Sequence, residues 1–506
     1  MYGSVETPYD KEDHGRAEIA SSLPMFQRRR VYLTVSAVAL GVLVAAATIS
    51  SWPAGQSTSV PLMGLSSQPP HLPSISERGK TLKAARDDIA FFMKGKEDAY
   101  DPVENPDGYL VMLVAENKLM QAEMAQKLEQ IQAEAPLPEW IFNYGLPGGK
   151  DTFKASIAKM MQHWIHAPVD PDYLRFQSGA GSMLAQIAFI LTDPGDGVLT
   201  NAPGYPAFAG DFGLYAGDKL HHAESLPENG YVPTTQELDD AFAKAIAAGN
   251  PPKVLIICQP HNPTGVVYSK KAMERMVEWA LDNGLHVVSD EIYALSTFPG
   301  YHTYSAADVV HRKYPDRERY LGDRVHIVAG LSKDWGMSGF RVGSLFSHNR
   351  ALLTGLDTIG YYQMVSQYTQ NALTRVFEDD AFVSWYIGEN RRRLHETYLA
   401  LQDALDLIDV PLLPSQGAIF AWADFSAYIL EGQTEKDLWM ELFNEAKVAL
   451  TTGESCGANK PGMFRIVYGW PKGGREAMKE FGERLVKWKM AREAANGETV
   501  EDAHRS

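Results

Sequence analysis

The chain has 506 residues, and its 47 Lys+Arg against 63 Asp+Glu give a formal net charge of −16. A composition of 45% apolar and 22% charged residues is typical of globular proteins, and it excludes a wholly disordered chain, a collagen-like repeat and a polytopic membrane protein. The acidic balance argues against nucleic acid as a partner. Two cysteines make no disulfide framework, and no Cys/His cluster has the spacing of a metal site, so we expect no metal.

An apolar segment near the N-terminus departs from this average. Residues 31–52 carry no charge, are long enough to span a bilayer, and follow Arg28–Arg30. We therefore expect a cytosolic tail over 1–30, a transmembrane or targeting segment over 31–52, a linker over 53–85, and a single-pass membrane protein. The alternative is an organelle-targeted soluble protein, because the segment is rich in alanine rather than leucine.

Short apolar strands alternate with helical patterns along the rest of the chain. Residues 182–192 are apolar enough for a buried helix. Ser269 predicts the start of another helix, whose apolar residues repeat at helical spacing up to Gly284. Strands are expected over 196–200, 253–258, 285–289 and 325–329. The alternation predicts an α/β fold with a mostly parallel sheet between helices.

Unusual polar residues follow three of these strands. Asn262 follows the strand over 253–258, Asp290 and Tyr293 follow the next, and Lys333 follows the third, with Arg341 eight residues further on. Each has an ordinary explanation as a turn, a cap or a solvated loop residue. In such sheets, however, ligands bind beyond the carboxyl ends of the strands. An acid, a phenol, an amide, a lysine and an arginine at one edge suit a phosphorylated pyridine aldehyde.

On these residues the chain resembles the class I/II aminotransferase family, the fold-type I pyridoxal-phosphate (PLP) enzymes, and is most similar to the ACC (1-aminocyclopropane-1-carboxylate) synthases. The resemblance spans about residues 95 to 490. It is carried by the separated blocks Tyr100–Leu119, Asp193–Asp196, Asn262–Gly265, Asp290–Tyr293, Ser332–Gly343 and Pro461–Arg465. It implies a large PLP-binding domain over 151–350, a smaller α+β domain made from 86–150 and 351–490, and a tail over 491–506.

The resemblance implies catalytic roles for Lys333, Asp290 and Tyr293. Lys333 would hold the cofactor as an internal aldimine and, once displaced by the substrate amine, act as the base at Cα of the external aldimine. Asp290 would keep the pyridine nitrogen protonated, which makes the ring a better electron sink. Asn262 and Tyr293 would donate hydrogen bonds to the phenolic oxygen of the ring.

The other cofactor contacts are expected at the phosphate and at the ring face. Arg341 and Ser332 would hold the phosphate. The turn that opens the buried helix would add its amides and dipole through Gly179, Ala180, Gly181 and Ser182. Tyr205 would stack on the ring, and the alternative for this tyrosine is core packing.

Substrate contacts are implied at Glu116, Tyr144, Asn262 and Arg465. Arg465 would grip the α-carboxylate of an amino-acid substrate with two hydrogen bonds. Tyr144 resembles the aromatic residue that reaches the cofactor of a neighbouring subunit, which implies a homodimer with shared active sites. Glu116 occupies an acidic position that looks peculiar to the ACC-synthase subgroup, and a carboxylate on a helix surface is the alternative.

Some residues depart from the pattern of the family. Gly330 stands where a serine is usual, and Gly181 stands where ACC synthases carry a hydroxyl, although Ser182 could compensate. The loop from Tyr144 to Lys150 differs in length from that of the subgroup. Losing one neutral hydrogen bond costs about 0.5–1.5 kcal/mol, which is too little to abolish cofactor binding.

These residues serve the first half of a reaction that several enzymes share. We expect a PLP-dependent aminotransferase-like enzyme that acts on an α-amino acid. The alternatives are an ACC synthase, which converts S-adenosylmethionine to the cyclopropane amino acid, a related C–S lyase, and a catalytically inactive membrane-tethered scaffold.

Overall fold

The computed structural model describes residues 74–82 and 87–503, and the chain divides into two units, residues 1–83 and 84–506. In the first unit the described element is the short helix α2 (Glu77–Thr81), which begins where the Ser76 hydroxyl accepts a hydrogen bond from the Gly79 amide. All other described elements belong to the second unit.

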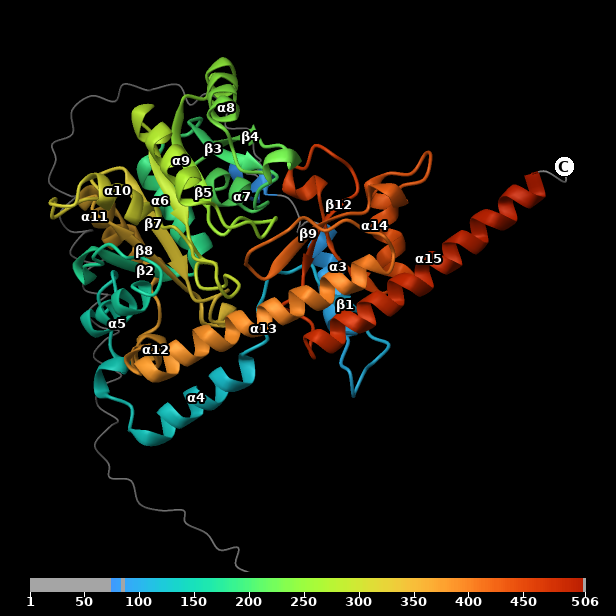
Figure 1. Ribbon diagram of the computed structural model, residues 1–506. Coiled ribbons are helices and arrows are strands. Elements are labelled where there is room, and N and C mark those ends of the chain that lie inside the picture. Colours follow the sequence, from blue (N-terminus) through green and yellow to red (C-terminus); the bar gives the residue numbers. More distant parts are fainter. Residues whose placement is uncertain (1–73, 83–86, 504–506) are drawn as a thin grey trace, which may run out of the picture. The chain divides into compact units, whose positions relative to one another are not determined.

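A seven-stranded sheet lies at the centre of the second unit (Figure 1), in the order β2-β8-β7-β6-β5-β3-β4. Its strands are β2 (Leu174–Ser178), β3 (Gly197–Ala202), β4 (Lys219–Glu224), β5 (Pro252–Cys258), β6 (His286–Asp290), β7 (Val325–Gly330) and β8 (Val342–Ser347). The pairs from β4 to β7 are parallel, whereas β8 is antiparallel to both of its neighbours. The predicted α/β fold with a mostly parallel sheet is confirmed.

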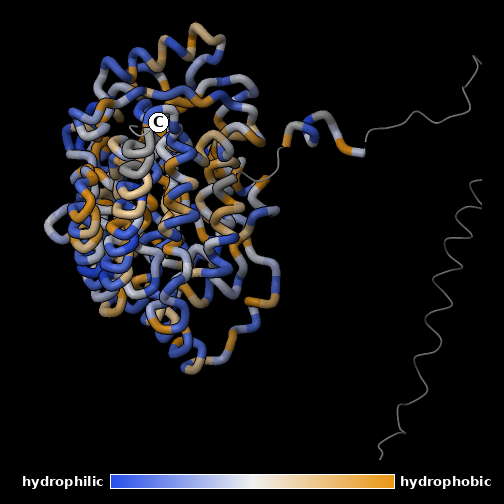
Figure 2. The backbone as a smooth tube through the Cα atoms, turned by 90° about the vertical axis from the view of Figure 1, so that its right-hand side faces the viewer, coloured by the Kyte–Doolittle hydropathy of each residue, from blue (hydrophilic) through white to orange (hydrophobic). Residues whose placement is uncertain are grey.

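Helices pack against this sheet, with α6 on β2, β7 and β8, α9 on β6, and α10 on β7. The helices of this layer are α5 (Asp151–Met161), α6 (Ala180–Leu191), α7 (Phe208–Gly213), α8 (Thr235–Ala247), α9 (Lys270–Asp282), α10 (Ala306–Lys313) and α11 (Arg350–Ile359). The prediction for α9 is confirmed, because the Ser269 hydroxyl accepts a hydrogen bond from the Ala272 amide and Gly284 ends the helix with a positive φ of 72°. Hydrophobic and hydrophilic residues alternate along the helical turns in Figure 2, as expected of helices that bury one face.

Two smaller sheets complete the unit. In one, β9 (Phe420–Asp424) and β11 (Thr451–Thr452) flank β12 (Met463–Val467) antiparallel; in the other, β1 (Leu110–Val111) pairs parallel with β10 (Val448–Ala449). Helices α3 (Asp87–Glu97) and α14 (Glu435–Asn444) pack on these sheets. The other helices are α4 (Gln121–Glu134), α12 (Gln367–Glu378), α13 (Asp380–Asp406) and α15 (Arg475–Ala503), of which α12 packs against α4, α5 and α13. The 3-10 turns are η1 (Glu139–Phe142), η2 (Pro171–Tyr173), η3 (Pro227–Asn229), η4 (Ser338–Phe340), η5 (Gly360–Gln363), η6 (Ser426–Tyr428) and η7 (Glu454–Cys456).

The β1–β10 pair joins two segments that are far apart in the sequence, and the long helices α13 and α15 pack along one another beside it (Figure 1). A core of buried apolar side chains runs without interruption from the large sheet to the smaller ones. An early and a late segment of this unit therefore lie side by side. The domain boundaries at 150 and 350 stay predictions.

The predicted membrane localisation is wrong for the part of the chain that the structure describes. In residues 74–82 and 87–503 no helix is both long and apolar enough to cross a bilayer. The segment 31–52, on which the prediction rested, lies outside the described residues, as do the tail over 1–30 and most of the linker over 53–85. We therefore withdraw the assignment of a single-pass membrane protein.

A pair of histidines joins β6 to β7 at the end of the sheet opposite Asp290. His286 Nδ1 and His326 Nε2 are 3.0 Å apart, and His326 Nδ1 lies 2.8 Å from the Ser347 hydroxyl. Burial lowers the pKa of His286 to about 4, with Arg324 adding to the shift. Burial also lowers the pKa of His326, and His286 contributes. Both imidazoles are therefore neutral in the folded protein at pH 7.

We predict that this pair makes the fold less stable in mild acid. Unfolded histidines take up protons near pH 6.5, whereas the folded pair resists protonation until lower pH, so the free energy of unfolding falls as the pH drops below about 6.5. The melting temperature of the wild type should decrease more between pH 7 and pH 5 than that of His286→Asn. The variant of the exposed His302, His302→Asn, is the control and should keep the wild-type slope. Equal slopes for His286→Asn and wild type would contradict the prediction.

Candidate active site

The strands β5, β6 and β7 end at the same edge of the sheet, with Cys258, Asp290 and Gly330 as their last residues. A cavity of about 220 Å³ lies at this edge. The predicted residues in its wall are Ala180, Gly181, Tyr205, Asn262, Asp290, Tyr293, Ser332, Lys333 and Arg341. The wall also contains Leu184, Asp211, Ile292 and Ser338, which are not among the predicted site residues. Five predicted residues lie outside the wall, namely Glu116, Tyr144, Gly179, Ser182 and Arg465.

Asp290 presents a buried carboxyl group to the cavity. Its Oδ1 has no hydrogen-bond partner among the described residues. Burial raises the pKa of Asp290 to about 7, while a hydrogen bond from the Ile292 amide and the charge of Lys333 oppose the shift. A buried carboxylate of this kind is costly unless a cation or an N–H donor meets it. The protonated nitrogen of a pyridine ring would supply both.

Lys333 lies in the wall of the same cavity, and its Nζ donates a hydrogen bond to the carbonyl of Ala115. Burial lowers the pKa of Lys333 to about 8, and Arg465 lowers it further, whereas Glu116 and Asp290 oppose the shift. A lysine with this pKa is present in part as the free amine near neutral pH. The free amine is the form that attacks an aldehyde or accepts a proton.

Asn262, Tyr293 and Arg465 form a connected group. Asn262 Nδ2 donates a hydrogen bond to the Tyr293 hydroxyl at 3.3 Å, and Arg465 Nη1 donates to Asn262 Oδ1 at 3.0 Å. Arg465 Nη2 donates to the Leu113 carbonyl and to the Thr451 hydroxyl, while its Nε has no partner among the described residues. The guanidinium of Arg465 therefore lies directly behind the cavity wall, with one donor unused.

The N-terminus of α6 forms one end of the cavity. No side chain caps this helix, and its first residues, Ala180 and Gly181, line the cavity. Free amides and the helix dipole at such an end favour an anion. Gly179, which precedes the helix with a φ of 95°, makes room for a cation, because a Cβ there would lie 2.3 Å from the Arg341 guanidinium. Arg341 and the first amides of α6 are thus placed to hold a phosphate together.

The departures from the family pattern have visible consequences here. The Ser182 hydroxyl donates to the Ser178 carbonyl at 3.1 Å, so it is turned into the helix and does not replace the hydroxyl absent at Gly181. At Gly330 a Cβ would lie 2.9 Å from the Val342 carbonyl oxygen and 3.4 Å from Ile292 Cδ1. The close approach of β7 and β8 therefore excludes the serine that the family usually carries at this position.

Glu116 lies next to the cavity rather than in its wall. It belongs to a loop before α4, so it is not a carboxylate on a helix surface. Its carboxylate accepts hydrogen bonds from the Ser338 hydroxyl at 2.7 Å and from Trp470 Nε1 at 3.1 Å. Glu116 lines a second cavity of about 610 Å³, which shares Ser338 with the first.

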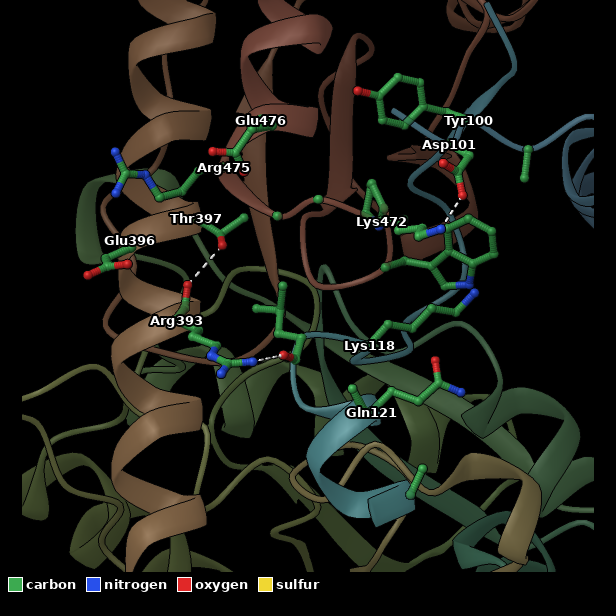
Figure 3. A pocket seen from close by; sticks show the side chains of 18 residues that line it. Tyr100, Asp101, Lys118, Gln121, Arg393, Glu396, Thr397, Lys472, Arg475 and Glu476 are labelled. Carbon is green, nitrogen blue, oxygen red and sulfur yellow. Dashed lines mark hydrogen bonds and ion pairs between the residues drawn. The ribbon is translucent and has the colours of Figure 1, made fainter. Parts of the chain in front are cut away.

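A third cavity, of about 770 Å³, continues from the second, with which it shares Lys118 and Gln121 (Figure 3). In the figure Lys472 points toward Asp101, with which it forms an ion pair. The Lys118 ammonium lies 3.4 Å above the ring of Trp470. The three cavities are thus neighbours that share wall residues, and Lys333 lines the first of them.

Tyr144 lies away from the cavity of its own chain. Its side chain is 88% exposed, and the nearest aromatic ring, that of Tyr361, is 6.4 Å away between centroids. The described chain therefore gives Tyr144 no contact with its own site, and a role at a neighbouring subunit stays a prediction.

Sequence reasoning missed two acids of this region. Glu291 is fully buried and accepts hydrogen bonds from Trp164 Nε1, the Ser289 and Ser305 hydroxyls and the Ala306 amide. These bonds fix the end of β6 and hence the adjoining Asp290; an Asp-Glu pair directly after an apolar strand was the available signal. Asp211 lies on α7, a short helix whose sequence carries no periodic signal, so its place in the cavity could not be anticipated.

Comparison with known proteins agrees with this geometry. The family profile described as "Aminotransferase class I and II" matches residues 111–485. Among curated relatives, 1-aminocyclopropane-1-carboxylate synthase 6 of Oryza sativa subsp. japonica is 31% identical over 426 residues, which cover 78% of this chain and 76% of the relative. A Mus musculus relative described as "Probable inactive 1-aminocyclopropane-1-carboxylate synthase-like protein 2" is 28% identical over 439 residues, with 85% and 74% coverage.

Among solved structures, an aspartate aminotransferase double mutant of Thermus thermophilus superposes with a TM-score of 0.68 at 20% identity, covering 82% of this chain and all of the other. The fold is therefore that of the fold-type I PLP enzymes. The chain belongs to the class I and II aminotransferase family and is ACC-synthase-like within it.

The cofactor is pyridoxal 5′-phosphate, as in the aminotransferases and ACC synthases of this family. The residues present fit it. Asp290 offers a carboxyl oxygen without a partner for the ring nitrogen, Lys333 an amine of lowered pKa for the aldehyde, and Arg341 a cation beside the α6 amides for the phosphate.

We predict that restoring the usual serine at Gly330 impairs the protein. Gly330→Ser places atoms against the Val342 carbonyl, and overpacking of this kind costs about 1–3 kcal/mol of unfolding free energy. Urea unfolding should show that loss, and cofactor affinity should fall rather than rise. Gly388→Ser on α13, where a Cβ meets nothing within 4 Å, is the matched control and should be neutral. Tighter cofactor binding by Gly330→Ser would contradict the prediction.

Proposed function

We propose that this protein is a PLP-dependent enzyme that removes the Cα proton of an α-amino acid with Lys333 and then transfers the amino group. The observation that carries the proposal is the convergence of Lys333, Asp290 and Arg341 on one cavity, with Arg465 directly behind its wall. When bound, the cofactor withdraws electrons from Cα, which makes this proton acidic enough to leave.

Each residue has a role that its surroundings support. Burial and Arg465 favour the neutral amine of Lys333, so the amine is able to accept the Cα proton near neutral pH. Arg465 orients the substrate by binding its α-carboxylate. Two of its donors serve this purpose: Nη1, which bonds to Asn262, and Nε, which has no partner among the described residues. Tyr293 and Asn262 orient the ring through its phenolic oxygen.

The neighbouring cavities support a path for the substrate, in which they are entered in turn. The second cavity, at Glu116 and Ser338, adjoins the cofactor cavity and has room for a substrate side chain. The third, around Lys118 and Trp470, lies further from Lys333 and is the entrance.

A second candidate is the ACC-synthase reaction, in which the γ substituent of S-adenosylmethionine leaves after Cα deprotonation. The observation in its favour is Glu116, whose carboxylate is held beside the cofactor cavity by Ser338 and Trp470. A carboxylate there would attract a sulfonium cation. The mouse relative described as probably inactive shows that resemblance to ACC synthases does not imply this activity. A related C–S lyase would use the same groups.

We further propose a homodimer in which Tyr144 reaches the cofactor of the partner subunit. The exposure of Tyr144 supports this role, because an aromatic side chain that contacts no site in its own chain is free to serve another. An inactive scaffold is disfavoured, since Lys333, Asp290 and Arg341 are all present and meet at one cavity.

The reaction is tested with the purified full chain and PLP. An amino acid with a 2-oxo acid should yield the new amino acid and oxo acid; S-adenosylmethionine is supplied in parallel. The cyclopropane amino acid would favour the second candidate, ammonia with an oxo acid would favour the lyase, and no product from any substrate would overturn all three. Lys333→Ala should lose at least about 10³-fold in turnover and the absorbance of the lysine-bound cofactor. Lys271→Ala, at an exposed lysine on α9, is the control and should be unaffected.

A further inference from the structure

A second carboxyl group enters the cofactor cavity beside Asp290. Asp211 lies on α7 and lines the cavity next to the N-terminus of α6, where a Cβ on Gly181 would lie 3.3 Å from Asp211 Oδ1. The influences on the pKa of its carboxyl group are burial and the charge of Asp290, with no hydrogen bond from a described residue among them. Asp211 therefore lines the same cavity as Asp290 and lies beside the turn that would receive the phosphate.

The groups around Asp211 do not neutralise it. Burial raises the pKa of Asp211 to about 7, and the charge of Asp290 adds to the shift. The helix α7 packs against α6, which has no ionisable side chain, and against β4. The ionisable groups of β4 are Lys219, His221, His222 and Glu224. The other ionisable groups in the cavity wall are Tyr205, Tyr293, Lys333 and Arg341.

A phosphate bound at the α6 turn would further favour the protonated form of Asp211 over the ionised form. An ionised Asp211 would face the negative charges of both the phosphate and Asp290 in a site of low dielectric, whereas a protonated Asp211 would offer an O–H donor. The two states of this carboxyl group therefore have opposite effects on an anion at the α6 turn.

We propose that Asp211 is a cofactor-contacting residue, protonated in the loaded enzyme, whose loss of a proton weakens the hold on the cofactor phosphate as the pH rises. The inference rests on the proposed cofactor site. It is specific to this chain's own residues, because Gly181 leaves the α6 turn without a hydroxyl and brings the turn against Asp211.

The direction in which pH changes the dissociation constant of the cofactor follows from proton linkage. If cofactor binding raises the pKa of Asp211, binding takes up a proton, and the dissociation constant increases with pH above the pKa of the empty site. A single group of this kind changes the constant by up to about tenfold per pH unit. Asp211→Asn keeps a donor of the same shape and cannot ionise, so it removes this contribution.

The experiment measures the dissociation constant of PLP for the full-length protein by fluorescence titration between pH 6 and 8.5. The ratio of the wild-type constant to that of Asp211→Asn should rise about tenfold over this range. Ionisation of the cofactor and of Lys333 is common to both proteins and cancels in the ratio. Calorimetry at pH 7.5 in buffers of different ionisation enthalpy should show more proton uptake on binding by the wild type than by the variant.

Asp218→Asn is the matched control. Asp218 is a buried carboxyl group whose pKa burial likewise raises, to about 6, but it bonds to Thr192 and lies outside the cavity wall. It should keep the wild-type profile. Asp211→Ser, which keeps a hydroxyl donor and does not ionise, replaces Asp211→Asn if that variant fails to fold. A ratio that is constant with pH would overturn the inference and leave the proposed function intact, whereas a wild type that binds no PLP would overturn the proposed function.

Discussion

The site depends on the burial of a carboxyl group and an amine in one cavity without an ion pair to stabilise them fully. Asp290 keeps an oxygen without a partner, and Lys333 bonds to a main-chain carbonyl instead. Burial raises the pKa of the acid and lowers that of the amine, so both lie near neutrality. A buried carboxyl group and a buried amine with such pKa values favour a ligand that offers a cationic nitrogen to the acid and an aldehyde to the amine.

The fold maintains this arrangement through rigid elements. Asp290 ends a buried strand, and the neighbouring Glu291 is fixed by four hydrogen-bond donors. Arg465 comes from a different sheet and meets Asn262 behind the cavity wall. Because the core is continuous between the sheets, Asp290 from one sheet and Arg465 from another are held at fixed distances around Lys333.

The departures from the family pattern are best understood as local adjustments. Gly330 is required by the approach of β7 to β8, and Gly181 lies against Asp211. The Ser182 hydroxyl does not replace the lost hydroxyl, because it bonds to the Ser178 carbonyl at the start of its own helix. A short polar side chain near a helix start has its own backbone as the nearest acceptor, and a sequence does not tell which acceptor it selects.

The sequence by itself determined the α/β class, the strands over 253–258, 285–289 and 325–329 to within one residue, and the family, because apolar periodicity and local motifs act over short distances. It points to Glu116 and Arg465 only through the family resemblance and gives no signal for Asp211, since these positions depend on loops and on contacts between remote segments. The apolar segment over 31–52 also led to a membrane assignment that the described residues do not support. Tertiary packing alone decided which polar groups meet, because burial and proximity, rather than residue type, set their charge and their partners.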